Sequence, residues 1–147
     1  RIILKAPGIA NVSFVRMKEV IKHELNHIYL YRIPQHHSMP AWFKEGLAMR
    51  SANEFSLLHK IEISKSNWKK QTIPLKRLQN ISTYSAGKIK LAYGESAAAV
   101  EALEYYYGDN ILNNILKEMR LGMDFQQALQ SSINEDLLDF QTNFDIY

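Results

Sequence analysis

The feature that most constrains this chain is a pair of histidines, His23 and His27, in a stretch that contains neither proline nor glycine. Asn11 or Ser13 can cap a helix at the start of this stretch, and Pro34 ends it. Side chains four residues apart lie one turn apart on the same face of a helix. The spacing therefore predicts a long helix that points both imidazoles the same way.

A glutamate follows the first of these histidines, which completes an H-E-x-x-H motif. Two imidazoles at this spacing can converge on one zinc ion, at about 2.0–2.1 Å from each nitrogen. At about 100° per residue, Glu24 points to the side of the metal where a water molecule would lie. The alternative is a buried histidine pair held by hydrogen bonds in the core, and the five residues by themselves leave both interpretations open.

The other side chains of this predicted helix divide into an apolar face, a charged face and the face of the two histidines. The apolar face is predicted to enter the core, and it contains Phe14, Met17, Ile21, Leu25 and Ile28. A helix that is buried on one face and lines a cleft on another is expected to have this pattern.

Catalytic zinc sites usually have three protein ligands, so a third ligand is required. The candidates are His36, His37 and Glu45. The two histidines lie directly after the first helix, where the chain turns away from the metal. Glu45 lies early in a second predicted helix, which can return antiparallel and bring a carboxylate level with His27. The small residues Gly46 and Ala48 would let the two helices approach closely, and we therefore choose Glu45.

The whole chain is predicted to be mainly α with a small N-terminal β element, in a single domain over residues 1–147. Its 147 residues suffice for a hydrophobic core. No run of 18 apolar residues occurs, so no transmembrane segment is expected. The absence of cysteine excludes disulfides and thiolate ligands, which leaves nitrogen and oxygen ligands for a metal. The predicted elements are strands at 1–5 and 57–63 and helices at 13–33, 38–56, 96–107, 109–122, 124–133 and 135–144.

Two segments together resemble a known family. The H-E-x-x-H motif is followed by Pro40-Ala-Trp-Phe-Lys-Glu-Gly-Leu-Ala48, and the pair resembles the gluzincin metallopeptidases, especially the small peptidase MA-like domains. The resemblance continues through Ile73-Pro-Leu-Lys-Arg-Leu78 and Ala92-Tyr-Gly-Glu-Ser-Ala-Ala-Ala-Val100, and it covers roughly residues 16–144. It implies a zincin-like fold that lacks much of the family's upstream sheet. Similar domains occur in cell-envelope proteins, and the sequence itself leaves the compartment undecided.

The resemblance also implies roles for individual residues. His23, His27 and Glu45 would bind Zn²⁺, and Glu24 would take a proton from the water that attacks a peptide carbonyl. Tyr93 matches the tyrosine that donates to the developing oxyanion in larger gluzincins. Its alternative role is that of a core aromatic whose hydroxyl reaches a backbone group.

One departure from the family pattern concerns the residue one turn after the third ligand. Many gluzincins have an acidic residue there that orients a zinc-bound histidine, whereas this chain has Met49. Asn26, Glu54 or a backbone carbonyl are the available substitutes, and nothing in the sequence selects among them.

Three functions follow from these patterns. The first is a zinc peptidase that acts on a peptide or protein substrate, and the second is a catalytically weak or inactive interaction domain of the same fold. The third is a nucleic-acid-binding module, because residues 1–90 carry a net charge of +11 and residues 91–147 one of −8. Only Trp68 and Tyr84 lie among the basic residues between Lys60 and Lys90 as base-stacking aromatics, so no nucleic-acid partner is expected.

Overall fold

The computed structural model describes residues 13–33, 39–53 and 72–147. These residues form helices, turns and irregular segments, with no strand among them. The mainly α expectation is therefore confirmed for the described part of the chain, whereas the small N-terminal β element is not supported. The strands predicted at 1–5 and 57–63 lie outside the described residues. None of the described helices is both long and apolar enough to cross a bilayer.

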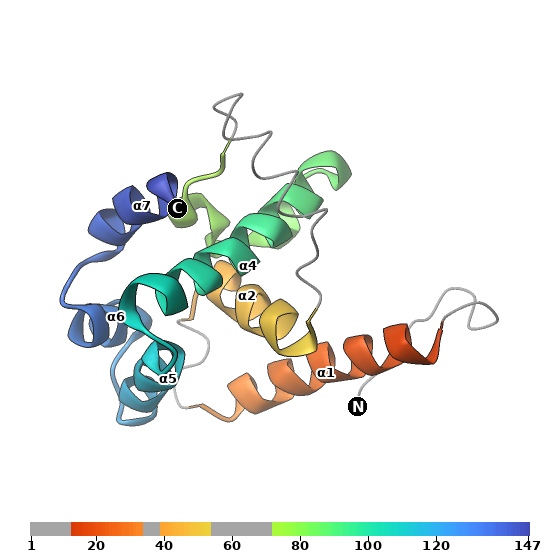
Figure 1. The fold of residues 1–147 in the computed structure, drawn as a ribbon, viewed down its shortest axis with the longest axis horizontal. Coiled ribbons are helices and arrows are strands. Elements are labelled where there is room, and N and C mark those ends of the chain that lie inside the picture. The colour runs from red at the N-terminus through yellow and green to blue at the C-terminus, as the bar shows by residue number, and fades with distance from the viewer. Residues whose placement is uncertain (1–12, 34–38, 54–71) are drawn as a thin grey trace.

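Three helices surround the candidate site. Helix α1 spans Phe14–Tyr31, α2 spans Ala41–Ala52 and α4 spans Ala86–Tyr107. The predicted cap of α1 is confirmed at Ser13, whose side chain accepts a hydrogen bond from the backbone nitrogen of Arg16 at 3.2 Å. Helix α2 packs against both α1 and α4, and Figure 1 shows it between them.

The predicted end of α2 and the predicted start of α4 are wrong. Helix α2 ends at Ala52 rather than near Ser56, because Asn53 adopts a left-handed conformation with φ 58° that stops the helix. Helix α4 begins at Ala86 rather than at Ser96. Gly87 and Gly94 lower the intrinsic helix propensity of this segment, but packing of α4 against α2 compensates for the loss.

The C-terminal part consists of short helices. Two 3-10 helices, η3 at Leu75–Gln79 and η4 at Ile81–Thr83, precede α4. Helices α5, α6 and α7 follow it at Ile111–Arg120, Phe125–Ile133 and Leu137–Ile146.

The caps of α6 and α7 only partly agree with the prediction. Asp124 caps α6 as expected, and its side chain accepts from the backbone of Gln127 at 2.9 Å. Asn134 was expected to cap the last helix, but it ends α6 in a left-handed conformation with φ 59°. Asp136 caps α7 instead. Asparagine favours both kinds of helix end, so its position in the sequence did not decide between them.

The core is centred on aromatic side chains from α2, α6 and α7. Trp42 and Phe43 are completely buried, and their rings lie 5.6 and 4.9 Å from the ring of Phe125. Trp42 also stacks on Phe140, at a ring distance of 6.3 Å. These contacts fix the start of α2, which carries Glu45, on the C-terminal helices.

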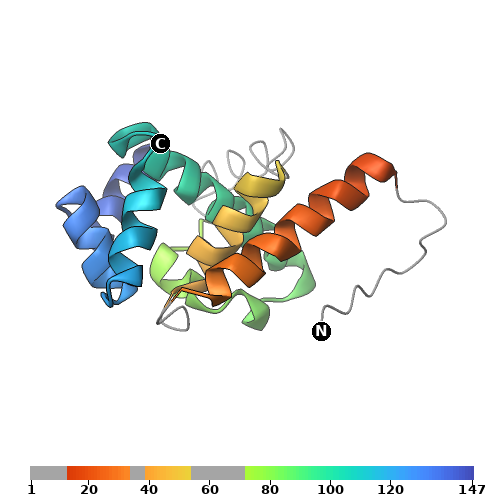
Figure 2. The ribbon, with the colours of Figure 1, turned by 90° about the horizontal axis from the view of Figure 1, so that it is seen from below.

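The apolar face of α1 does not enter the core as predicted. Phe14 is 65% exposed and Leu25 is 54% exposed, whereas Leu30 is the buried residue of this helix. Figure 2 shows the N-terminal half of α1 extending away from the other helices. Among the described residues α1 packs mainly on α2, through the face that carries the histidines. The hydrophobic pattern therefore identified the helix correctly but not the face that packs.

Candidate metal centre

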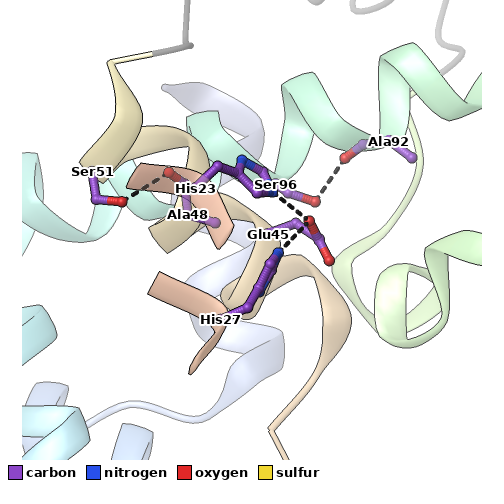
Figure 3. A network of polar contacts seen from close by, with 7 residues as sticks. All are labelled: His23, His27, Glu45, Ala48, Ser51, Ala92 and Ser96. Atoms are coloured by element: carbon purple, nitrogen blue, oxygen red, sulfur yellow. Dashed lines mark hydrogen bonds and ion pairs between the residues drawn. The ribbon is translucent and has the colours of Figure 1, made fainter. Parts of the chain in front are cut away.

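His23 and His27 lie one turn apart on α1, and their ring centroids are 4.8 Å apart. The Nε2 atoms of both rings point at the same atom, Oε2 of Glu45, and each lies 3.5 Å from it. Figure 3 shows the two imidazoles on either side of this carboxylate. The three side chains are partly buried, with their ligand atoms within 4.8 Å of one another. The structure therefore brings together the three residues that the sequence selected as ligands.

Glu45 reaches α1 because its neighbour Gly46 lies against α4. A Cβ atom at Gly46 would come within 2.4 Å of the carbonyl oxygen of Ser96 and within 2.5 Å of Cγ2 of Val100. The expectation that Gly46 eases the approach of the first two helices was therefore wrong, since its close contact is with α4. Consecutive residues of α2 thus contact α4 and α1, and the carboxylate is directed towards the histidines.

The distances fit a metal ion better than a hydrogen-bonded pair. Three ligands at about 2.0–2.1 Å from a tetrahedral zinc are separated from one another by about 3.3 Å. The observed nitrogen–oxygen separations of 3.5 Å are close to this value. They exceed the roughly 2.7–3.2 Å of a good N–H···O hydrogen bond. Two imidazoles and a carboxylate are also a common ligand set for a catalytic divalent zinc ion.

The electrostatics of the cluster favour an ionised carboxylate. Burial by itself would raise the pKa of Glu45, but the long polar contacts with His23 and His27 and the charge of these rings outweigh burial and lower the pKa to about 2. Glu45 is therefore negatively charged at neutral pH, as a metal ligand must be.

Tyr93 lies on the α4 side of the same site. Its pKa is raised, first by burial and then by the negative charges of Glu45 and Glu24. Both carboxylates are thus close enough to act on the tyrosine hydroxyl. Glu24 is itself half-buried on α1, next in sequence to His23. Tyr93 therefore lies within the electrostatic range of Glu45 and Glu24.

The remaining candidates fall into two groups, those outside the described residues and those on α1 and α2. His36, His37 and Glu54 lie outside the described residues. Met49 is buried. The Oδ1 atom of Asn26 is buried and has no hydrogen-bond partner within the described ranges. Of the two side chains considered as substitutes for the acidic residue missing at Met49, Asn26 is therefore the one that the structure describes, and its side-chain oxygen is uncommitted.

Sequence reasoning missed the part that α4 plays in positioning the site. Ser96 and Val100 lie one turn apart on α4 and both contact Gly46 of α2, and the residues from Ser96 to Ala99 are all buried. The run Ser-Ala-Ala-Ala was visible in the sequence as a signal for close helix packing, but nothing in the sequence identified its partner as Gly46.

Taken together, the described helices and side chains define a helical domain with a His–His–Glu cluster that could hold a metal ion. The family model of the peptidase MA superfamily matches residues 2–147, so the chain belongs to that superfamily. This membership confirms the resemblance to peptidase MA-like domains and indicates a peptidase.

A curated relative adds no further functional information. The uncharacterised protein YhcO of Bacillus subtilis strain 168 is 28% identical over 108 residues. This match covers 71% of the present chain but 31% of that protein, so the chain spans only about a third of it. No solved structure gives a significant match.

Proposed function

We propose that this chain is a zinc-dependent peptidase domain of the gluzincin type, in which His23, His27 and Glu45 bind the metal. The observation that carries the proposal is the convergence of both Nε2 atoms on Oε2 of Glu45 at 3.5 Å. Membership of the peptidase MA superfamily supports the choice of peptide bonds as the substrate. The chain has no cysteine, so its ligands can only be nitrogen and oxygen atoms.

When bound, the metal would supply Lewis acidity and lower the pKa of a water molecule towards about 7. Glu24 is the proposed general base: its carboxylate accepts a proton as the water oxygen forms a bond to the peptide carbonyl carbon. Glu24 then returns the proton to the amine nitrogen as the carbon–nitrogen bond breaks.

Tyr93 is the proposed donor to the oxyanion that develops on the carbonyl oxygen. Its raised pKa keeps the hydroxyl protonated at neutral pH, so the hydroxyl remains a hydrogen-bond donor. A single donor of this kind is typically worth about 10²–10³ in kcat.

A second candidate function is an interaction domain that keeps the fold without efficient hydrolysis. It is favoured by the exposed apolar side chains of α1, such as Phe14 and Leu25. The two functions differ in whether the chain cleaves peptides once a metal is bound.

The testing experiment measures metal content by elemental analysis and hydrolysis of fluorescently labelled casein. Wild type is compared with His23→Ala and Glu45→Ala, and Glu118→Ala on α5 is the matched control. We expect near-stoichiometric zinc and casein cleavage in wild type and control, and loss of both in the two ligand variants. Wild type that binds no metal after zinc is offered would refute the proposal. Zinc binding without cleavage of any peptide would favour the interaction domain.

A further inference from the structure

Three tyrosine rings meet on the surface where α4 and α7 end. Tyr105 is 72% exposed, Tyr147 is 44% exposed and Tyr106 is 40% exposed. The ring of Tyr105 lies 5.1 Å from that of Tyr106 and 5.4 Å from that of Tyr147, and the remaining two rings are 6.1 Å apart. Figure 2 shows the C-terminal end of the chain beside the end of α4, where these three side chains form what we call the tyrosine patch.

The tyrosine patch lies away from the candidate metal centre. Tyr105 follows Tyr93 by twelve residues on α4, which corresponds to about 18 Å along the helix axis. Tyr93 is the residue of α4 whose hydroxyl is affected by the charges of Glu45 and Glu24. The exposed tyrosines are therefore not explained by the proposed hydrolysis.

Hydrogen bonding within the fold does not explain them either. Tyr107, the next residue along α4, is only partly exposed, and its hydroxyl donates to Oε2 of Glu135 at 2.8 Å. The hydroxyls of Tyr105 and Tyr106, by contrast, form no hydrogen bond with another described residue. A contiguous exposed patch of large apolar side chains indicates an interaction site, whereas such side chains scattered singly do not. The tyrosine patch therefore has the character of a docking surface.

The part of the chain that carries the tyrosine patch is acidic. Residues 101–147 contain nine acidic and two basic side chains, which gives a net charge of −7. Glu101 lies one turn before Tyr105 on α4. Burial, and then the charge of Glu101 and a hydrogen bond to it, raise the pKa of Tyr147 to about 12. A carboxylate is thus in direct contact with the patch.

Two further carboxylates lie close to Glu101. The pKa of Arg50 is raised, first by its hydrogen bond to Glu104 and then by charges that include those of Glu101 and Asp109. Nε of Arg50 donates to Oε2 of Glu104 at 2.8 Å. Three carboxylates and one guanidinium group leave an excess of two negative charges beside the tyrosine patch.

A guanidinium group matches both the rings and the carboxylates. It stacks on aromatic faces and donates paired hydrogen bonds to carboxylates. The three rings are inclined to one another by 54–80°, so they offer separate faces rather than one flat platform for a sugar or a base. Negative charge also repels the phosphates of nucleic acids. A symmetric contact with a second copy would bring two negative patches together.

We propose that the tyrosine patch and its carboxylates bind an arginine-rich segment of another polypeptide. Guanidinium groups of this segment stack on the exposed faces of Tyr105 and Tyr106 and pair with the carboxylate of Glu101. The proposal does not depend on the proposed peptidase function, because none of these residues belongs to the metal centre.

The experiment measures binding by fluorescence anisotropy. The parent protein is the full chain with zinc, and it carries Glu24→Gln so that the proposed base cannot cleave the probe. The probe is a fluorescein-labelled peptide of alternating arginine and serine with blocked ends, and a peptide with glutamate in place of arginine is the charge control. The added patch variants are Tyr105→Leu, which removes the aromatic face, and Glu101→Gln, which removes one charge. The matched controls are Tyr31→Leu, which replaces a tyrosine that is 71% exposed on α1, and Glu118→Gln on α5.

We expect the parent protein to bind the arginine peptide and not the glutamate peptide. The dissociation constant should rise by about threefold in each patch variant, because an exposed cation–π contact or a surface ion pair is lost. The two controls should bind like the parent protein. No binding of the arginine peptide, equal binding of the glutamate peptide, or equal weakening in the controls would overturn the proposal.

Two further measurements test the identity of the contact and of the occupant. Tyr105→Phe keeps the aromatic face, so it should bind like the parent protein, and a loss as large as that of Tyr105→Leu would overturn the stacking. Light scattering of the same samples measures the oligomeric state. A dimer that dissociates in Tyr105→Leu would overturn the proposal, because a second copy would then occupy the tyrosine patch.

Discussion

Gly46 and Ser96 are in such close contact that a Cβ atom on the glycine would lie 2.4 Å from the carbonyl oxygen of Ser96. The contact joins α2 to α4 at the residue next to Glu45. The position of the third candidate ligand therefore depends on a site that has no room for a side chain. A helical glycine normally costs stability relative to alanine, but here the close packing requires it.

The substitution Gly46→Ala is expected to destabilise the protein by about 1–3 kcal/mol, the usual cost of overpacking a core. The new methyl group would force α2 away from the backbone of α4. Urea unfolding followed by circular dichroism measures the change. Zinc affinity should fall in the same variant, because the displacement moves Glu45 relative to the two histidines.

Gly87→Ala is the matched control, since Gly87 also lies in a helix but an added Cβ would meet no atom within 4 Å. This variant should be as stable as wild type or more stable, by up to about 1 kcal/mol from helix propensity. A Gly46→Ala protein as stable as Gly87→Ala would contradict the close packing of α2 on α4.

The candidate site was more predictable than the packing around it. His23 and His27 follow from a local rule, the periodicity of one helix, and Ser13 marks its start. Glu45 required a second helix to fold back, which the spacing of the two predicted helices allowed and the resemblance to a family supported. The sequence singled out Tyr93 through the resemblance but left two roles open for it, because eight tyrosines offer the same chemistry. Its proximity to Glu24 and Glu45 depends on how α4 crosses α2.

The fold beyond the site was predictable only where local signals were unambiguous. Asp124 capped α6 as expected. Asn134 was expected to cap the start of the last helix, but it ended α6 instead. The start of α4 was missed because Gly87 and Gly94 weaken the local helical signal, and tertiary packing decides the outcome there. The packed face of α1 was misassigned because hydrophobicity indicates which side chains favour burial but not which surface is available to them.

This last difference leads to a prediction for two leucines of α1. Leu30 is 2% exposed and Leu25 is 54% exposed. Leu30→Ala should lower the free energy of unfolding by about 2–5 kcal/mol, the usual cost of truncating a buried leucine. Leu25→Ala should change it by about 0.5 kcal/mol or less. Chemical denaturation of the same full chain measures both, and equal losses would contradict the exposure of the Leu25 face.

A buried carboxyl group makes stability depend on pH. Glu95 is 1% exposed, and both of its oxygens lie within 3.0 Å of the backbone nitrogen of Ile73. Burial raises the pKa of Glu95 from 4.5 to about 8, against the lowering effect of the Ile73 hydrogen bond and with a further increase from the charge of Asp145. Between about pH 4.5 and pH 8, therefore, Glu95 is protonated in the folded state but ionised in the unfolded state.

The sign of the effect follows from this difference in bound protons. A proton bound more tightly in the folded state stabilises it fully below the unfolded pKa, and the stabilisation is lost as pH rises towards the folded pKa. Stability should thus fall between about pH 4.5 and 8, by at most about 1.4 kcal/mol per pH unit from this group. Glu95→Gln keeps an oxygen that can accept from Ile73 but cannot titrate. Urea unfolding across this range should give a flatter profile in the variant, and parallel profiles would exclude Glu95 as the source.

The proposed division of labour between Glu24 and Tyr93 gives the sharpest kinetic test. Glu24→Gln keeps the size and polarity of the side chain but removes the base, so kcat should fall by about 10²–10⁴ while zinc content stays at the wild-type level. Tyr93→Phe removes one donor, so kcat should fall by about 10²–10³ with KM nearly unchanged. Steady-state kinetics on one labelled peptide, with elemental analysis of each sample, measures both.

Tyr84→Phe is the control for the tyrosine, because the Tyr84 hydroxyl donates to the carbonyl oxygen of Arg77 on η3 at 3.1 Å and has no proposed role at the metal centre. It should leave kcat unchanged. If Tyr93→Phe also leaves kcat unchanged, Tyr93 is a packing residue of α4. If Glu24→Gln retains full activity, the proton must be transferred by another group and the proposed role of Glu24 is wrong. Loss of zinc in either variant would instead mean that the substitution disturbs the ligands, since neither side chain is proposed to bind the metal.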